Sequence, residues 1–214
     1  MAQCFRLGGG VVHPLIGRYK PSQFRGNMDS IKLSKFDVAE RQFLQAIRLF
    51  FEGGDEVSVH TLVEAANQVF SDLGKKQGIK GPIRESEWVR PEKRKEWRNH
   101  VYKSRNFFKH ADKDADETLE FKVLFNHMSI LEGLYMYHQY KLKWMPETMC
   151  YYFWFADRYP DLLVKEDPLN SEILAAFESG RLSSPVDLSL MRDLIKSMYN
   201  GGHSVSYIGT EMGL

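Results

Sequence analysis

The chain has 214 residues, of which 43% are hydrophobic, and its 29 Lys and Arg residues nearly balance 28 Asp and Glu residues. This composition excludes a globally disordered chain and fits one domain with short appendages. The apolar runs are too short to span a bilayer and residues 1–7 lack the features of a secretory signal, so we expect a cytoplasmic protein without membrane contact.

The two ends of the chain differ in composition from its middle. Glycines and prolines interrupt residues 1–30 and deny them a regular element, so we expect a flexible N-terminal extension. Met28 lies just before the ordered pattern begins, and we hypothesise that the native start is there. Residues 201–214 open with two glycines and are expected to form a frayed tail. One folded domain is therefore predicted over residues 31–200.

Apolar residues recur at helical spacing through this domain, and no persuasive strand pattern interrupts them. Ser34 fits the N-cap position of the first helix, and two glycines end that helix. The short turn that follows predicts an antiparallel hairpin with the second helix. We predict an all-α helical bundle of about five main helices (34–52, 58–73, 92–110, 117–142 and 146–159) plus two short C-terminal helices (171–179 and 187–199).

The small net charge hides a strong asymmetry along the chain. Residues 75–109 hold twelve Lys and Arg against four Asp and Glu, a balance of +8, whereas residues 110–187 have a balance of −7. Such a basic block can steer a polyanion to one surface. Alternatively, the basic and acidic helices pack side by side and neutralise each other.

The basic block ends in a short motif at residues 105–110, which read Arg-Asn-Phe-Phe-Lys-His. Arginine can hold a phosphate through its planar, permanently charged fork, and histidine can move a proton near neutral pH. On one continuous helix, Tyr102, Asn106 and His110 would form a line along a single face, with Arg105 on the adjacent flank. Two such helices crossing at a dimer axis could bring Arg105 and His110 around one cleft.

This motif resembles the signature of the HEPN superfamily, which consists of small helical-bundle proteins that are commonly metal-independent endoribonucleases. The resemblance implies RNA as a partner, a homodimer, and no metal or other cofactor. It implies catalytic roles for Arg105 (stabilising charge on the phosphorane-like transition state), His110 (general acid or base) and Asn106 (orienting His110 or the phosphate). The basic segment would bind the RNA backbone through Lys93, Arg94, Lys95, Arg98, Tyr102 and Lys109.

A second resemblance covers more of the chain but implies no activity. A family of small bacterial proteins without assigned function is similar in two stretches, GGDEVSVHTLVEAANQVFSDLG and NFFKHADKDADETLEF. The competing interpretation of the whole chain is a non-catalytic helical interaction or scaffold protein. In that interpretation Asn106 and His110 cap the third helix, and Arg105 pairs with an acidic neighbour.

Other candidate residues are given structural interpretations. Residues 112–120 resemble the start of a calcium loop but lack its glycine and its last bidentate glutamate, so we interpret them as an acidic link in which Asp116 caps the fourth helix. His60 is interpreted as a polar residue in a first helical turn, with an approach to His110 across the bundle as the alternative. Glu132 is interpreted as a residue on the wet flank of its helix, with a lone buried acid as the alternative. Cys150 is interpreted as a small buried apolar residue, and the aromatic run 151–155 is expected in the core or at a dimer surface, with stacking on bases as the alternative.

Overall fold

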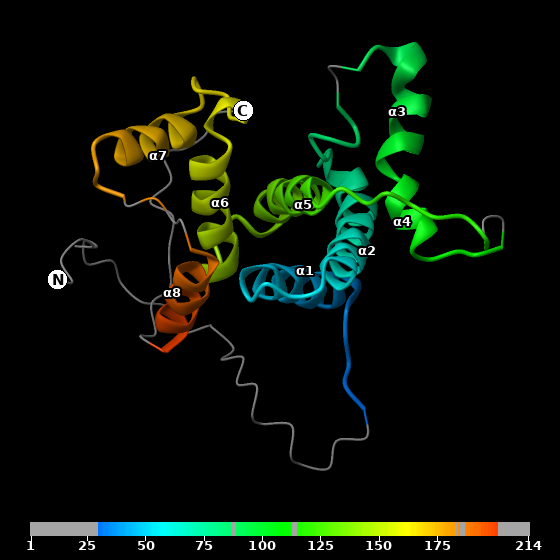
Figure 1. Ribbon diagram of the computed structural model, residues 1–214, viewed down its shortest axis with the longest axis horizontal. Coiled ribbons are helices and arrows are strands. Elements are labelled where there is room, and N and C mark those ends of the chain that lie inside the picture. The colour runs from blue at the N-terminus through cyan, green and yellow to red at the C-terminus, as the bar shows by residue number, and fades with distance from the viewer. Residues whose placement is uncertain (1–29, 87–88, 113–114, 183, 185–186, 201–214) are drawn as a thin grey trace. The chain divides into compact units, whose positions relative to one another are not determined.

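The computed structural model describes residues 30–86, 89–112, 115–182, 184 and 187–200, and all regular elements in these ranges are helices (Figure 1). Its internal contacts divide the chain into two units, 1–33 and 34–214, and the helices belong to the second. The all-α prediction is confirmed. Of the predicted extension 1–30, only Ser30 is described, and the predicted tail 201–214 lies outside the described residues.

The first two helices form the predicted hairpin and begin at side-chain caps. In α1 (Lys35–Phe51), the Ser34 hydroxyl accepts the Asp37 backbone N–H at 3.1 Å, and the Asp37 carboxylate accepts the Ser34 backbone N–H at 2.8 Å. This reciprocal capping box satisfies two N–H groups that a helix start leaves open. Asp55 caps α2 (Glu56–Gly74) in a similar way, by accepting from the Ser58 backbone N–H at 2.7 Å.

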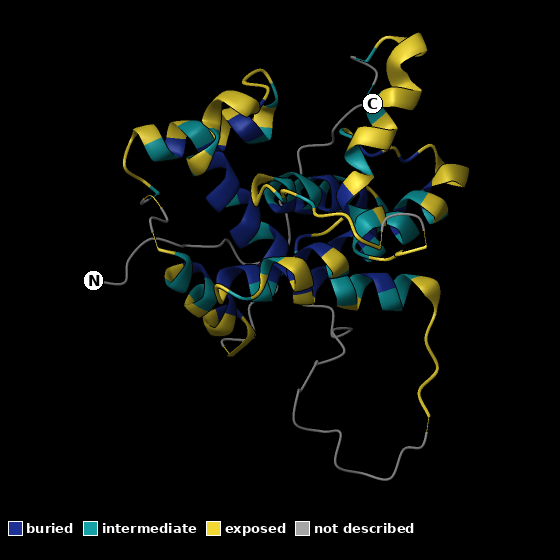
Figure 2. Ribbon diagram, turned by 45° about the vertical axis from the view of Figure 1, so that its right-hand side comes forward, coloured by how far each residue is buried: buried dark blue, intermediate teal, exposed yellow. Residues whose placement is uncertain are grey.

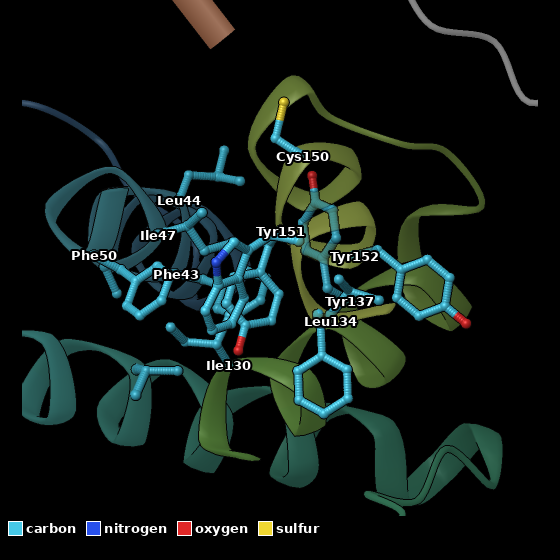
Figure 3. Close-up of a cluster of buried hydrophobic side chains, with 14 of the residues drawn as sticks. Phe43, Leu44, Ile47, Phe50, Ile130, Leu134, Tyr137, Cys150, Tyr151 and Tyr152 are labelled. Atoms are coloured by element: carbon cyan, nitrogen blue, oxygen red, sulfur yellow. The ribbon is translucent and has the colours of Figure 1, made fainter. Parts of the chain in front are cut away.

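The core of the bundle is aromatic and lies where α1 and α2 meet α5 (Leu124–Lys141) and α6 (Pro146–Arg158) (Figure 3). Phe43 meets Phe70 edge-on with 5.7 Å between ring centres, a preferred aromatic geometry. The Tyr137 hydroxyl donates to a Glu40 carboxylate oxygen at 2.7 Å, so the buried ring keeps a polar partner. Cys150 is fully buried as expected, and burial raises the pKa of its thiol to about 12.

Two C-terminal helices complete the described bundle, α7 (Pro168–Glu178) and α8 (Leu188–Asn200), both close to their predicted ranges. Both α7 and α8 pack on α6. The fully buried Glu147 of α6 joins three helices, because its carboxylate accepts from Arg48 Nε at 2.7 Å and from the Tyr199 hydroxyl at 2.8 Å.

The prediction of one helix over residues 92–110 is wrong. A short 3-10 turn (Pro91–Lys93) leads into α3 (Arg94–Val101), which ends at Tyr102, and a separate short helix α4 (Lys103–Phe107) follows. No residue of α3 is buried. A helix that buries none of its residues has few packing contacts to hold it continuous. His110 therefore lies beyond the helix and not on it.

The predicted start of the fourth helix is also wrong, since α5 begins at Leu124 and Asp116 does not cap it. Phe121 precedes the helix and packs 4.9 Å from the His60 ring, centre to centre. The buried face of α5 includes Asn126 and Glu132, which an apolar pattern does not reveal. A Cβ atom at Gly81 would overlap the Glu132 carboxylate, so only glycine allows this loop to lie so close to α5.

Candidate nucleic-acid interface

Residues 89–110, which contain α3 and α4, are called the basic arm. Its cations Lys93, Arg94, Lys95 and Arg98 are all exposed, and Figure 2 shows α3 coloured mostly as exposed. Lys93 Nζ lies 2.8 Å from a Glu96 carboxylate oxygen, but both side chains are more than half exposed. Exposed pairs of this kind are worth at most about 1 kcal/mol, so this pair leaves the surface available to a stronger anion.

Two contacts attach α3 and Tyr102 to the body of the bundle. The indole Nε1 of Trp97 donates to the Ile83 carbonyl oxygen at 2.7 Å. Tyr102 lies against two guanidinium groups, with its ring centre 4.2 Å from Arg105 Cζ and 5.3 Å from Arg84 Cζ. These cation–π contacts already use the ring that was predicted to bind nucleic acid. Tyr102 therefore acts first as a structural contact of the arm.

The structure brings Arg105 and Asn106 together. Arg105 is half-buried, and its Nη1 donates to the Gln68 side-chain oxygen of α2 at 2.5 Å. Its Nε and Nη2 lie 3.4 and 3.3 Å from the Asn106 side-chain oxygen. The guanidinium is thus held by α2, by Asn106 and by the Tyr102 ring.

His110 lies at the end of the arm and is exposed, as is Lys109. The His110 backbone N–H donates to the Asn106 carbonyl oxygen at 3.0 Å, which continues the turn beyond α4. Tyr102, Asn106 and His110 are therefore connected by backbone hydrogen bonds, and they do not lie along one continuous helix as predicted. Within the described residues of one chain, hydrogen bonds join the Arg105 and Asn106 side chains, but none joins either of them to the imidazole of His110.

Beneath the arm lies a buried ionic cluster that the sequence did not reveal. Arg84, only 4% exposed, has its Nη2 2.6 Å from a Glu64 carboxylate oxygen and its Nε 3.7 Å from Glu132. Glu132 also accepts the Ile83 backbone N–H at 2.8 Å. Burial raises the pKa of Glu132 to about 7, against the opposing charge of Arg84 and the backbone donors. The shorter contact makes Glu64 the main partner of Arg84.

Glu132 is about 1% exposed, so the interpretation that placed it on the wet flank of its helix is wrong. His60 is also about 1% exposed and therefore lies inside the bundle. A signal for the buried polar face was present in α2. His60, Glu64 and Asn67 follow one another at spacings of four and three residues, and all three are buried. That spacing places them on one face of the helix, beside the apolar stripe. A row of polar residues beside an apolar stripe can be buried when side chains of another helix satisfy its hydrogen bonds, as Asn126 does for His60.

The aromatic run 151–155 lies mainly in the core, with four of its five residues buried, as expected. Within the described residues, no cluster of three His, Cys, Asp or Glu side chains is placed to hold a metal ion. The acidic stretch 112–120 falls partly outside those residues. Among all the residues that the structure describes, no helix has the length and apolar character needed to cross a membrane.

Comparison with protein-family models, with characterised proteins and with solved structures finds no match for this chain.

Proposed function

We propose that the protein binds RNA along the basic arm, with Arg105, Asn106 and His110 contacting phosphate at its end. The supporting observation is that α3 buries none of its residues while Lys93, Lys95 and Arg98 are exposed on it. A helix that contributes no side chain to the core yet carries a dense positive charge is better explained by an external anion than by stability. Lys and Arg side chains that neutralise backbone phosphates release counterions, and this release drives binding.

Cleavage is the finer part of the proposal and uses the resemblance to HEPN proteins. The RNA 2′-hydroxyl would attack the adjacent phosphorus, His110 would transfer a proton, and Arg105 would stabilise the charge that develops. Arg105 is already oriented by Gln68 and Asn106. The exposed His110 would meet the arginine of a second copy, so the cleavage proposal includes a homodimer.

One observation favours the alternative, a non-catalytic interaction protein. Arg105 uses its guanidinium to attach α4 to α2 through Gln68 and to cover the Tyr102 ring. These contacts alone would explain an arginine at this position. On this alternative, Arg105→Gln loosens the arm but changes no chemistry.

Binding is tested by fluorescence anisotropy with a labelled single-stranded RNA over a range of salt concentrations. Each phosphate contact with a single strand contributes about 0.7 to the slope of log affinity against log salt. Replacing Lys93, Lys95 and Arg98 with Gln should therefore reduce the slope by about 2 and weaken binding at least tenfold. The matched control replaces three exposed lysines outside the arm, Lys122, Lys165 and Lys196. Equal losses in both triple variants would contradict the assignment to the arm.

Cleavage is tested separately, by incubating RNA with the wild-type chain and with His110→Ala in the presence of a chelator. Exposure of His110 makes the variant a mild change for the fold. The proposal requires cleavage by the wild type and at least a hundredfold loss in the variant. Intact RNA, or cleavage that survives the substitution, removes the catalytic part and leaves the binding result to stand by itself.

A further inference from the structure

A chain of buried hydrogen bonds runs from α4 through α2 to α5. The exposed cations of the arm take no part in it. Ser104 Oγ lies 2.9 Å from His60 Nε2, and His60 Nδ1 lies 3.0 Å from Asn126 Oδ1. The three side chains come from three different helices and are at most 6% exposed. The order of hydroxyl, imidazole and orienting group is the order found in sites of nucleophilic catalysis.

Glu56 fixes the direction of the protons in this chain. The Asn126 side-chain nitrogen donates to the Glu56 carbonyl oxygen at 3.0 Å and to its carboxylate at 2.6 Å. Because both of these partners only accept, Asn126 must present its oxygen to His60. His60 Nδ1 then carries the hydrogen, and Nε2 is left as the acceptor for the Ser104 hydroxyl. Burial, opposed by Glu64 and Asn126, lowers the pKa of His60, which keeps the imidazole neutral and able to accept.

Ser104 and His60 line a partly open cavity of about 120 Å³. Its polar wall also includes Arg84 and Glu132, and Trp97 contributes to its apolar wall. Arg84 is 4% exposed, and within the described residues its Nη1 has no hydrogen-bond partner. A guanidinium N–H that is buried and unpaired costs free energy. Because Arg84 lines the cavity that Ser104 also lines, its guanidinium is a cationic group of that wall that can stabilise an oxyanion.

We propose that Ser104 is the nucleophile of a second site, which hydrolyses esters of short acyl groups. Ser104 Oγ bonds to the acyl carbon while its proton passes to His60 Nε2, and Arg84 holds the resulting oxyanion. The bond to the leaving alcohol breaks as that oxygen takes the proton from His60. Water then repeats the sequence on the acyl-serine, which releases the carboxylic acid and restores Ser104 without oxidation or reduction.

The size of the cavity sets the class of acyl group. An engineered cavity of about 150 Å³ in another protein accommodates benzene, so a cavity of about 120 Å³ suits an acyl group of roughly two to four carbons. Trp97 and the other apolar side chains of the wall favour an uncharged acyl group. The chain should therefore prefer acetyl and butyryl esters to long-chain esters.

The test uses the full chain with a fluorophosphonate probe, followed by peptide mapping, and with 4-nitrophenyl acetate, butyrate and laurate. We expect the probe on Ser104, hydrolysis of acetate and butyrate at least tenfold faster than of laurate, and at least a hundredfold loss in Ser104→Ala. Ser71→Ala, which removes a half-buried serine of α2 outside this hydrogen-bond chain, serves as the matched control and should stay within twofold of the wild type.

Labelling of the folded wild type decides the matter even if Ser104→Ala destabilises the chain. An unlabelled Ser104, or ester hydrolysis that persists in folded Ser104→Ala, overturns the proposal. The readouts do not depend on RNA, so failure here is distinguishable from failure of the basic arm to bind RNA.

Discussion

The basic arm and the buried cluster beneath it both use arginine, and they use it in opposite ways. Arg84 is 4% exposed and lies between the buried carboxylates of Glu64 and Glu132. Arg98 is exposed on a helix without buried residues. Charge that is paired inside the protein contributes to stability, whereas charge on a helix without buried residues is available for recognition at the surface. The following experiments test this division, from the largest expected effect to the smallest.

The largest loss of stability is expected from Arg84→Met, which leaves Glu64 buried without its cation. Removing one partner of a buried ion pair costs about 3–5 kcal/mol. Urea unfolding followed by circular dichroism measures the change in the free energy of unfolding. Arg98→Met is the matched control and should change this free energy by less than about 0.5 kcal/mol, since it removes an exposed charge. Similar losses from both substitutions would break the division between the two regions.

The second effect is a pH dependence of stability caused by Glu132. Its pKa in the folded chain is about 7, above the ordinary value of 4.5, so the native state binds the proton more tightly than the unfolded state. The stabilisation is complete below pH 4.5 and is lost as the pH rises through 7. Each pKa unit corresponds to about 1.4 kcal/mol, so this shift gives a loss on the order of 3 kcal/mol.

Glu132→Gln isolates this contribution, because the other titrating groups are common to both proteins. The free energy of unfolding of the wild type minus that of Glu132→Gln should decrease by this amount between pH 5 and pH 8. A difference that stays constant over that range would show that Glu132 ionises at its ordinary pKa.

A third, smaller effect concerns the attachment of the arm. Trp97→Phe keeps an aromatic ring but removes the Nε1–H that donates to the Ile83 carbonyl oxygen. A single hydrogen bond of this kind contributes about 1 kcal/mol. Amide hydrogen exchange should accelerate about fivefold in α3 while the exchange of α1 and α2 is unchanged. Uniform acceleration in all helices would instead mean that the arm unfolds only with the core.

The sequence predicted the helices that form the core, but it did not predict the positions where buried polar residues determine the packing. Ser34 marks the start of α1, Gly53 and Gly54 follow its end, and Pro146 begins α6. These boundaries were predictable because caps and helix breakers act locally. The break at Tyr102 follows from the absence of buried residues on α3, which only the folded chain shows. Burial of His60 depends on Asn126, 66 residues away, so no local pattern could have paired them.

The smallest effect on stability, and the sharpest test of recognition, is expected from Lys93→Gln. Its ion pair with Glu96 is exposed on both sides, so its loss should change the free energy of unfolding by no more than about 0.5 kcal/mol. In the proposed complex with RNA, the same substitution removes one phosphate contact, and it should then lower the salt slope of RNA binding by about 0.7. Parallel unfolding and anisotropy measurements give both quantities. Because the pair contributes little to folding, a loss of affinity without a loss of stability would assign this charge to an external anion. A loss of stability without a loss of affinity would assign it to the fold.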